Sequence, residues 1–223
     1  VSTQRRRHPI APPVAGFVNE PDSDPTDPAV RNRLHAAVRS TTAYDEPLIV
    51  DTIDAIDEIV KRARAALPHW SRLDIARRCE VLLRVAEVFR TERFDTIQIM
   101  AAEAAKVARE GDPEVSEAID FATYYATVGL DVLGQQEAEG AVLEPRGVVV
   151  VASPWTFPYA IPSGGVIAAL AAGNTVILKP PPEARLTELH SVVQLHRAGV
   201  PEDVVQYDER PANDGGHPRM RHP

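Results

Sequence analysis

The chain has 223 residues, of which 44% are hydrophobic and 25% charged, and its formal net charge is −8. This length allows one large or two small cores, and the acidic balance argues against a general nucleic-acid-binding protein, which would carry a basic face. The single cysteine excludes an intramolecular disulfide and a paired-cysteine metal site, and fits a reducing cytoplasm. No apolar run approaches the roughly twenty residues of a membrane-spanning helix, and no apolar segment follows the N-terminal arginines. We therefore expect a cytoplasmic protein without a membrane partner.

The N-terminal half predicts helices. Residues 1–26 are rich in proline and polar side chains, which indicates an extended or disordered segment. Asp27 followed by Pro28 is a typical helix start, because the carboxylate caps the first turn and proline is tolerated there. Apolar residues at helical spacing then predict helices over 29–39, 51–67, 72–90, 94–109 and 113–133. Pro68 is predicted to end the second of these, and Gly111 to separate the last two.

Two groups of side chains on these helices invite a functional interpretation. Cys79 falls on an apolar stripe, so we expect it to behave as a small buried hydrophobe rather than as a catalytic thiol. Glu114, Glu117 and Asp120 lie on roughly one side of the last helix. We interpret them as a solvated face without a role in chemistry.

The stretch from Gly147 to Pro182 predicts a parallel βαβ unit. Four consecutive valines, residues 148–151, form a run too short for a helix and without polar alternation, which suits a strand buried on both faces. Residues 164–172 are apolar on every side and predict a buried helix, which Gly173 caps. Residues 175–178 are a second β-branched strand that three prolines end.

Three further elements are predicted around this unit: a short strand over 141–144, a helix over 186–198 and a strand over 204–207. His196 is predicted to pack against the sheet with its polar atoms satisfied. Residues 208–223 contain no Val, Ile, Leu or aromatic residue, so we expect a disordered tail. The sequence therefore predicts an α/β fold, with N-terminal helices over 27–133 followed by a βαβαβ arrangement over 141–207.

The loop after the first strand and the end of the second strand meet at the carboxyl edge of such a sheet, where ligands bind in open α/β folds. The loop from Ser153 to Pro158 reads S-P-W-T-F-P, and Lys179 ends the second strand. A cation at this edge suits an anionic or hydroxyl-rich ligand such as a nucleotide. A lysine at a strand end is more often a solvated charge, and spacing alone does not decide between the two.

The residues of this stretch carry a family resemblance. S-P-W-T-F-P followed by G-V-I-A-A-L-A-A-G-N-T-V-I-L-K-P is similar to the aldehyde dehydrogenase superfamily. The resemblance implies an NAD or NADP site to which Ser153, Pro154 and Trp155 contribute, with Pro154 and Trp155 at the nicotinamide end. It also implies that Lys179 reaches the adenosine ribose.

The sequence departs from the family pattern at two places. Thr156 stands where the family usually has an Asn whose amide helps to hold the oxyanion. The acid that binds the ribose usually follows the lysine after two residues, whereas here Pro182 takes that place and Glu183 follows one residue later.

Two further segments resemble a narrower branch. F-V-N-E-P-D-S-D-P and E-V-S-E-A-I-D-F-A-T-Y-Y-A are similar to the dehydrogenase half of bifunctional proline-catabolic enzymes. That half oxidises glutamate semialdehyde, which forms from 1-pyrroline-5-carboxylate. The resemblance therefore implies a small-molecule aldehyde as substrate.

The resemblance covers the opening part of the family pattern, from about residue 17 to 207, without the cysteine nucleophile, the glutamate base or the glycine-rich pyrophosphate turn. It implies an N-terminal fragment that is inactive alone and binds NAD or NADP weakly or not at all. Two alternatives remain open: a non-catalytic binding or interaction module, and one half of a split enzyme with a complementing catalytic chain. A homo-oligomer is compatible with each. His217 and His222 lack the company of metal ligands, so no metal site is expected.

Overall fold

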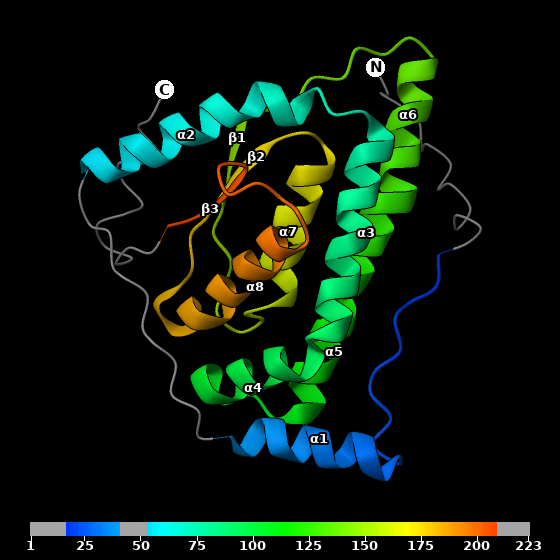
Figure 1. The fold of residues 1–223 in the computed structure, drawn as a ribbon, viewed down its shortest axis with the longest axis vertical. Helices are drawn as coiled ribbons and strands as arrows, with labels where there is room; N and C mark the ends of the chain where they lie inside the picture. Colours follow the sequence, from blue (N-terminus) through cyan, green and yellow to red (C-terminus); the bar gives the residue numbers. More distant parts are fainter. Residues whose placement is uncertain (1–16, 41–52, 209–223) are drawn as a thin grey trace, which may run out of the picture.

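The computed structural model describes residues 17–40 and 53–208 (Figure 1). The elements in chain order are α1 Pro28–Arg39, α2 Ile53–Ser71, α3 Ile75–Thr91, α4 Arg93–Ala104, α5 Ala108–Tyr124, η1 Tyr125–Gly129, α6 Leu130–Ala138, β1 Val148–Val151, α7 Ala160–Ala171, β2 Thr175–Leu178, η2 Pro182–Ala184, α8 Arg185–Arg197 and β3 Val205–Tyr207. Of the two short turns, η1 is π-helical and η2 is 3-10. The predicted order of N-terminal helices followed by a parallel α/β unit is confirmed. The predicted disorder of residues 1–16 and 209–223 lies outside the described residues.

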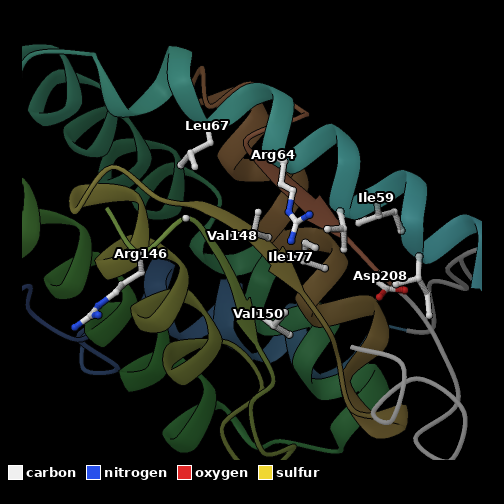
Figure 2. A pocket seen from close by; sticks show the side chains of 11 residues that line it. Ile59, Arg64, Leu67, Arg146, Val148, Val150, Ile177 and Asp208 are labelled. Atoms are coloured by element: carbon white, nitrogen blue, oxygen red, sulfur yellow. The ribbon is translucent and has the colours of Figure 1, made fainter. Parts of the chain in front are cut away.

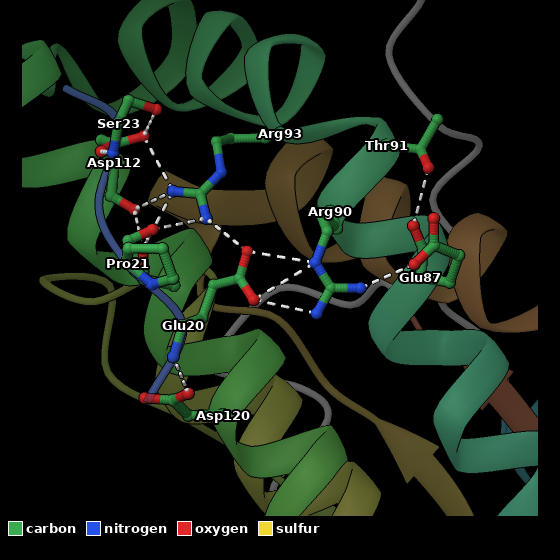
Figure 3. Close-up of polar contacts among 10 residues, drawn as sticks. Glu20, Pro21, Ser23, Glu87, Arg90, Thr91, Arg93, Asp112 and Asp120 are labelled. Atoms are coloured by element: carbon green, nitrogen blue, oxygen red, sulfur yellow. Dashed lines mark hydrogen bonds and ion pairs between the residues drawn. The ribbon is translucent and has the colours of Figure 1, made fainter. Parts of the chain in front are cut away.

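An extended N-terminal strap, residues 17–26, precedes α1 and lies against α5 (Figures 1 and 3). The backbone N–H of Glu20 donates to Asp120 at 2.6 Å, and the backbone N–H and hydroxyl of Ser23 donate to Asp112 at 2.6 and 2.7 Å. The interpretation of Asp120 as part of a solvated face is therefore wrong. Its carboxylate fixes the strap, because the extended backbone would otherwise lack acceptors for its N–H groups.

The strap also contributes to a buried ion-pair network (Figure 3). Arg93 is only 6% exposed, and its guanidinium donates to Asp112 at 3.0 Å and to the Ser116 hydroxyl at 2.9 Å. Glu20 of the strap bridges Arg93 and Arg90, at 3.4 and 2.9 Å respectively. Several partners around each charge compensate for the loss of hydration.

Proline does not end α2 as predicted. The helix continues through Pro68 to Ser71. The reason lies two residues further on, where Trp70 is almost fully buried and its indole Nε1 donates to the carbonyl of Leu170 at 3.1 Å. Packing of this large side chain against α7 outweighs the hydrogen bond that proline cannot donate.

The break between the middle helices falls at Ala105 rather than at Gly111. Ala105 has φ 54°, a left-handed conformation that ends α4, and the N–H of Lys106 then donates to the carbonyl of Met100 at 3.3 Å. Gly111 lies inside α5, where a Cβ would meet the Met100 side chain at 3.4 Å. Two other predictions are also corrected: the helical region predicted to end at residue 133 continues to Ala138, the end of α6, and residues 141–144 do not form a strand.

The three parallel strands lie in the order β1-β2-β3. β2 is buried along its whole length, and its residues alternate between two helical layers. Ile177 packs against α2, whereas Val176 and Leu178 belong to the main core with α7 and α8. β1 is at one edge of the sheet, so its Val150 is 44% exposed, and the prediction of burial on both faces is wrong for this residue.

The remaining helices complete the main core on the α7 and α8 side of the sheet. α3 and α5 run side by side and pack against α7 (Figure 1). As predicted, His196 of α8 packs at the sheet, where its Nε2 lies 2.9 Å from the carbonyl oxygen of Val205. Among the described residues, no helix combines the length and apolar character needed to cross a membrane.

Candidate functional site

The loop over residues 152–159 leaves β1 at the carboxyl edge of the sheet and leads into α7. It carries four of the predicted site residues: Ser153, Pro154, Trp155 and Thr156. Trp155 is 51% exposed, Pro154 and Thr156 are also exposed, and Ser153 is half-buried. An indole exposed at a sheet edge offers a flat apolar surface to a ligand ring.

A buried carboxylate fixes the end of this loop. Glu114 of α5 is 2% exposed and accepts hydrogen bonds from the backbone N–H groups of Tyr159 and Ala160, at 3.1 and 3.2 Å. It also forms an ion pair with Lys106, whose ammonium lies 4.7 Å from the centre of the Phe157 ring. The carboxylate therefore caps the N-terminus of α7 across the core.

The role of Glu114 was missed by the sequence analysis, which placed it on a solvated face. Periodicity cannot reveal the error, because it does not show which helix terminus a long-range fold brings to a carboxylate. The one hint in the sequence is Lys106, a possible partner for the Glu114 carboxylate. It lies eight residues earlier, which is too far for an ion pair within one helix, so the spacing alone does not predict this pair.

Tyr159 forms a second anchor for the loop. It is fully buried, its hydroxyl donates to Gln194 at 2.7 Å, and its ring centre lies 5.2 Å from that of Phe89. Burial raises the pKa of Tyr159 well above its usual value. The phenol therefore stays protonated and acts as a structural donor at the base of the loop.

Lys179 lies at the same edge as the loop, which is the juxtaposition that the sequence predicts. Its backbone N–H donates to the carbonyl of Val151 at 2.8 Å, and the N–H of Asp208 donates to the carbonyl of Leu178 at 2.9 Å. These bonds align the ends of the three strands, so Lys179 lies between the loop of β1 and the end of β3. The Lys179 side chain is half-buried.

The segment after Lys179 differs from the family pattern in structure as well as in sequence. Pro182 begins the turn η2, and Glu183 in the middle of this turn is exposed. The next helix, α8, has its N-terminus occupied by Glu103 of α4. The carboxylate of Glu103 accepts from the N–H groups of Leu186 and Thr187, at 2.7 and 2.8 Å.

The cysteine of the chain lies away from this edge. Cys79 is on α3, where it packs partly buried against the main core. Burial, together with the nearby Glu80, raises the pKa of the Cys79 thiol. Both effects disfavour the thiolate, so Cys79 lacks the setting of a nucleophile. Within residues 17–40 and 53–208, no three His, Cys, Asp or Glu side chains are grouped to hold a metal ion.

A pocket of about 340 Å³ lies on the face of the sheet that α2 covers, between α2 and β1 (Figure 2). Apolar side chains such as Ile59, Val148 and Val150 form its walls, with Arg64 and Asp208 at its polar part. None of the predicted site residues lines it. We therefore place the candidate site at the carboxyl-edge loop, where the predicted residues converge, and not in this pocket.

The parallel sheet with a proline-rich loop and a lysine at its carboxyl edge is an arrangement typical of a nucleotide-binding α/β enzyme domain. A sequence model of the aldehyde dehydrogenase family matches residues 49–223. The chain therefore belongs to the aldehyde dehydrogenase family.

Its relatives include dehydrogenases of proline catabolism. The 1-pyrroline-5-carboxylate dehydrogenase of Anoxybacillus flavithermus is 34% identical over 180 residues, which are 75% of this chain and 35% of that protein. The enzyme of the same name from Staphylococcus epidermidis is 36% identical over 163 residues, or 70% and 32% of the two chains. The chain thus spans about a third of the length of the curated relatives it matches.

Solved structures of proline-catabolic enzymes are also similar to this chain. The chain matches a Thermus 1-pyrroline-5-carboxylate dehydrogenase with bound NAD with a TM-score of 0.82 at 26% identity, covering 94% of this chain and 48% of that one. Proline utilization A from Corynebacterium freiburgense matches with a TM-score of 0.77 at 36% identity, covering 92% and 20%. The resemblance to proline-catabolic dehydrogenases and the predicted fold class are confirmed.

Proposed function

We propose that the carboxyl edge of the sheet is the cofactor side of an NAD(P)-dependent dehydrogenase that oxidises glutamate semialdehyde. The observation that carries this proposal is the placement of Lys179 beside the exposed Trp155 loop, joined through the hydrogen bond between Lys179 and Val151. Support comes from the family, whose members use NAD(P), and from relatives that are named 1-pyrroline-5-carboxylate dehydrogenase.

The side chains at this edge fit two parts of the cofactor. The ammonium of Lys179 and the exposed carboxylate of Glu183 supply a donor and an acceptor for ribose hydroxyls. Ser153, Pro154 and Trp155 would form the wall next to the nicotinamide, which supplies a hydride acceptor when bound. Thr156 would face the developing oxyanion, with a hydroxyl that is shorter than the usual amide.

These residues offer fewer groups that could bind the pyrophosphate of the cofactor. In nucleotide-binding α/β folds it often lies at a helix N-terminus, where free N–H groups favour negative charge. Here the N-terminus of α7 is occupied by Glu114, and that of α8 by Glu103. A second anion at either position would meet a carboxylate, so we expect weak binding of NAD(P) by the 223 residues alone.

The nucleophile would also come from elsewhere. The family reaction needs a thiolate that attacks the aldehyde and later leaves from the acyl group, and the pKa of the Cys79 thiol is raised within α3. We therefore propose that the catalytic thiol and the general base belong to sequence outside these 223 residues. The part described here would hold the cofactor and shape the oxyanion position.

A complementing catalytic chain is the second candidate, and one observation favours it. Val151 and Gly147 accept hydrogen bonds from β2, so the alternating N–H and C=O groups of Val148 and Val150 point to the open side of β1. Within residues 17–40 and 53–208 no strand pairs with this side of β1, and an unpaired edge is a template for another strand. A separate chain that carries the catalytic residues would add its strand here.

The proposed function is tested by joining residues 1–207 to the catalytic portion of a related 1-pyrroline-5-carboxylate dehydrogenase and measuring NADH formation with glutamate semialdehyde. We expect turnover in the fusion and none in the 223 residues alone. Lys179→Ala should lower kcat/KM for NAD by about tenfold or more, whereas the exposed Lys61→Ala on α2 serves as a matched control without effect. Turnover by the 223 residues that Cys79→Ala abolishes would overturn the assignment of the nucleophile to other sequence.

The same fusion tests the position of Thr156. Loss of one oxyanion donor typically costs about two decades in rate, so Thr156→Asn should raise kcat on the order of a hundredfold. Equal rates of the two forms would mean that Thr156 does not face the oxyanion.

A further inference from the structure

The loop beside the proposed site makes one contact that the proposed function does not use. Lys106 lies in the connection between α4 and α5, and its ammonium lies over the ring of Phe157, 4.7 Å from the ring centre. Phe157 is 48% exposed and directly follows Thr156 in the loop. A cation at this distance over an aromatic face is attracted by the negative face of the ring. The contact therefore joins the loop to the connection between the two helices.

A buried carboxylate holds the ammonium of Lys106 as well. Glu114 of α5 forms an ion pair with it, and the same carboxylate accepts hydrogen bonds from the backbone N–H groups of Tyr159 and Ala160. The Lys106 side chain is only 13% exposed, so little water competes with these partners. A desolvated cation interacts more strongly with an aromatic ring than an exposed one. Lys106 is thus linked to the loop at two points, directly at Phe157 and through Glu114 at the start of α7.

The backbone immediately before Lys106 has an unfavourable conformation. Ala105 has φ 54°, and within residues 17–40 and 53–208 it is the only residue other than glycine with a positive φ. A residue with a Cβ keeps such a conformation only where the surrounding structure fixes it. The contacts of Lys106 with Glu114 and Phe157 supply a constraint of this kind, because they fix the direction in which the chain leaves α4.

We propose that Lys106 is a positioning residue for the loop: its ammonium holds the Phe157 ring and, with it, the backbone at Thr156. Residues 152–159 belong to no helix or strand, so the contacts of their side chains set the position of the loop. A small displacement of a group that acts on the reacting atoms costs much of the rate. The consequence for aldehyde oxidation rests on the proposed function, in which Thr156 faces the developing oxyanion. The contact between Lys106 and Phe157 concerns this chain alone.

The contact is measured in the 223-residue protein without any ligand. The ring current of an aromatic side chain shifts the protons that lie over its face upfield, and NMR detects this shift at the Cε protons of Lys106. We expect the shift in the wild type and its loss in Phe157→Leu, which keeps an apolar side chain. The signal of the exposed Lys61 on α2 is the control and should not change. A Lys106 signal without the shift, or one that Phe157→Leu leaves as it is, overturns the proposal.

The effect on the reaction is measured in the fusion protein described above. Lys106→Met keeps an unbranched side chain and removes the charge, so kcat for glutamate semialdehyde should fall about tenfold while the Kd for NAD stays within about twofold. The two differ because the contact is made at the residue next to Thr156 and not at Trp155 or Lys179. Lys106→Arg should restore most of the rate, since a guanidinium also pairs with a carboxylate and stacks on an aromatic ring. Lys61→Met is the matched control without effect.

The outcomes separate this proposal from the proposed function. If no fusion turns over while the NMR contact is intact, the proposed function is refuted, and Lys106 still holds the loop. An unchanged kcat in Lys106→Met refutes the positioning role, and so does a loss that Lys106→Arg does not restore or that NAD affinity shares. Should Lys106→Met fail to fold, Phe157→Leu carries the same test, because its side chain is half-exposed and the same fall in kcat is expected.

Discussion

Removing the carboxylate of Glu114 tests whether the loop next to the proposed nicotinamide site is held from within the core. Two losses add up in Glu114→Ala. The N-terminus of α7 loses its acceptor for the N–H groups of Tyr159 and Ala160, which costs about 1 kcal/mol for a helix cap. Lys106 also loses the partner of its largely buried ammonium.

The second loss is the larger one. Breaking a buried ion pair from one side costs about 3–5 kcal/mol, and we take the lower end because Lys106 keeps some contact with water. The free energy of unfolding should therefore fall by about 3–4 kcal/mol in Glu114→Ala. Urea titration followed by circular dichroism measures it.

Glu117→Ala on the exposed face of the same helix is the matched control, with an expected change within about 0.5 kcal/mol. If Glu114→Ala costs no more than Glu117→Ala, then Glu114 does not fix the loop, and the argument from its hydrogen bonds is wrong. Glu114→Gln should fall between the two, because its amide oxygen still accepts from α7 while the charge that pairs with Lys106 is lost.

Three other substitutions give separate tests of the fold, each measured by urea unfolding. Asp112→Ala removes the main partner of the buried Arg93 and should cost about 3 kcal/mol or more, and an effect below 1 kcal/mol would show that water replaces the carboxylate. Ala105→Gly should stabilise the protein by about 0.5–1 kcal/mol, since glycine adopts the left-handed φ of 54° without strain, and a loss of stability would contradict that conformation. Glu188→Gln should be about 3 kcal/mol more stable than wild type at pH 7 and equal to it near pH 4.5. The folded-state pKa of Glu188 is raised from 4.5 to about 9, so its contribution to stability is full below pH 4.5 and is lost as the pH rises toward 9. Parallel curves of stability against pH would refute the raised value.

The order of elements could be predicted because it depends on local patterns. The four valines of β1, the apolar run of α7 and the glycine after it specify a strand, a helix and a stop without reference to distant residues. The ends of the helices were harder to predict than their order. Pro68 favours the end of a helix because proline lacks an N–H. The helix continues through it because Trp70 packs against α7 and bonds to Leu170, a contact between residues 100 positions apart in the sequence.

The hydrogen-bonding roles and the burial of the acidic residues could not be predicted from their spacing in the sequence. Glu114, Asp112 and Asp120 all lie on α5 and look alike in the sequence, yet Asp112 and Asp120 accept hydrogen bonds from the N-terminal strap and Glu114 accepts them from the start of α7. Glu188 appears in the sequence as an ordinary helix residue. Its burial follows only from the packing of α8 against α4 and β3.

The same acids limit what this part of the protein can bind. A parallel α/β sheet usually offers the helix N-termini at its carboxyl edge to phosphate groups. In this chain both N-termini at that edge are neutralised by carboxylates from the N-terminal helices, Glu114 at α7 and Glu103 at α8. A nucleotide in the proposed site would therefore gain little attraction from these two helix N-termini, and the residues that we propose for its binding are those of the 153–156 loop together with Lys179 and Glu183.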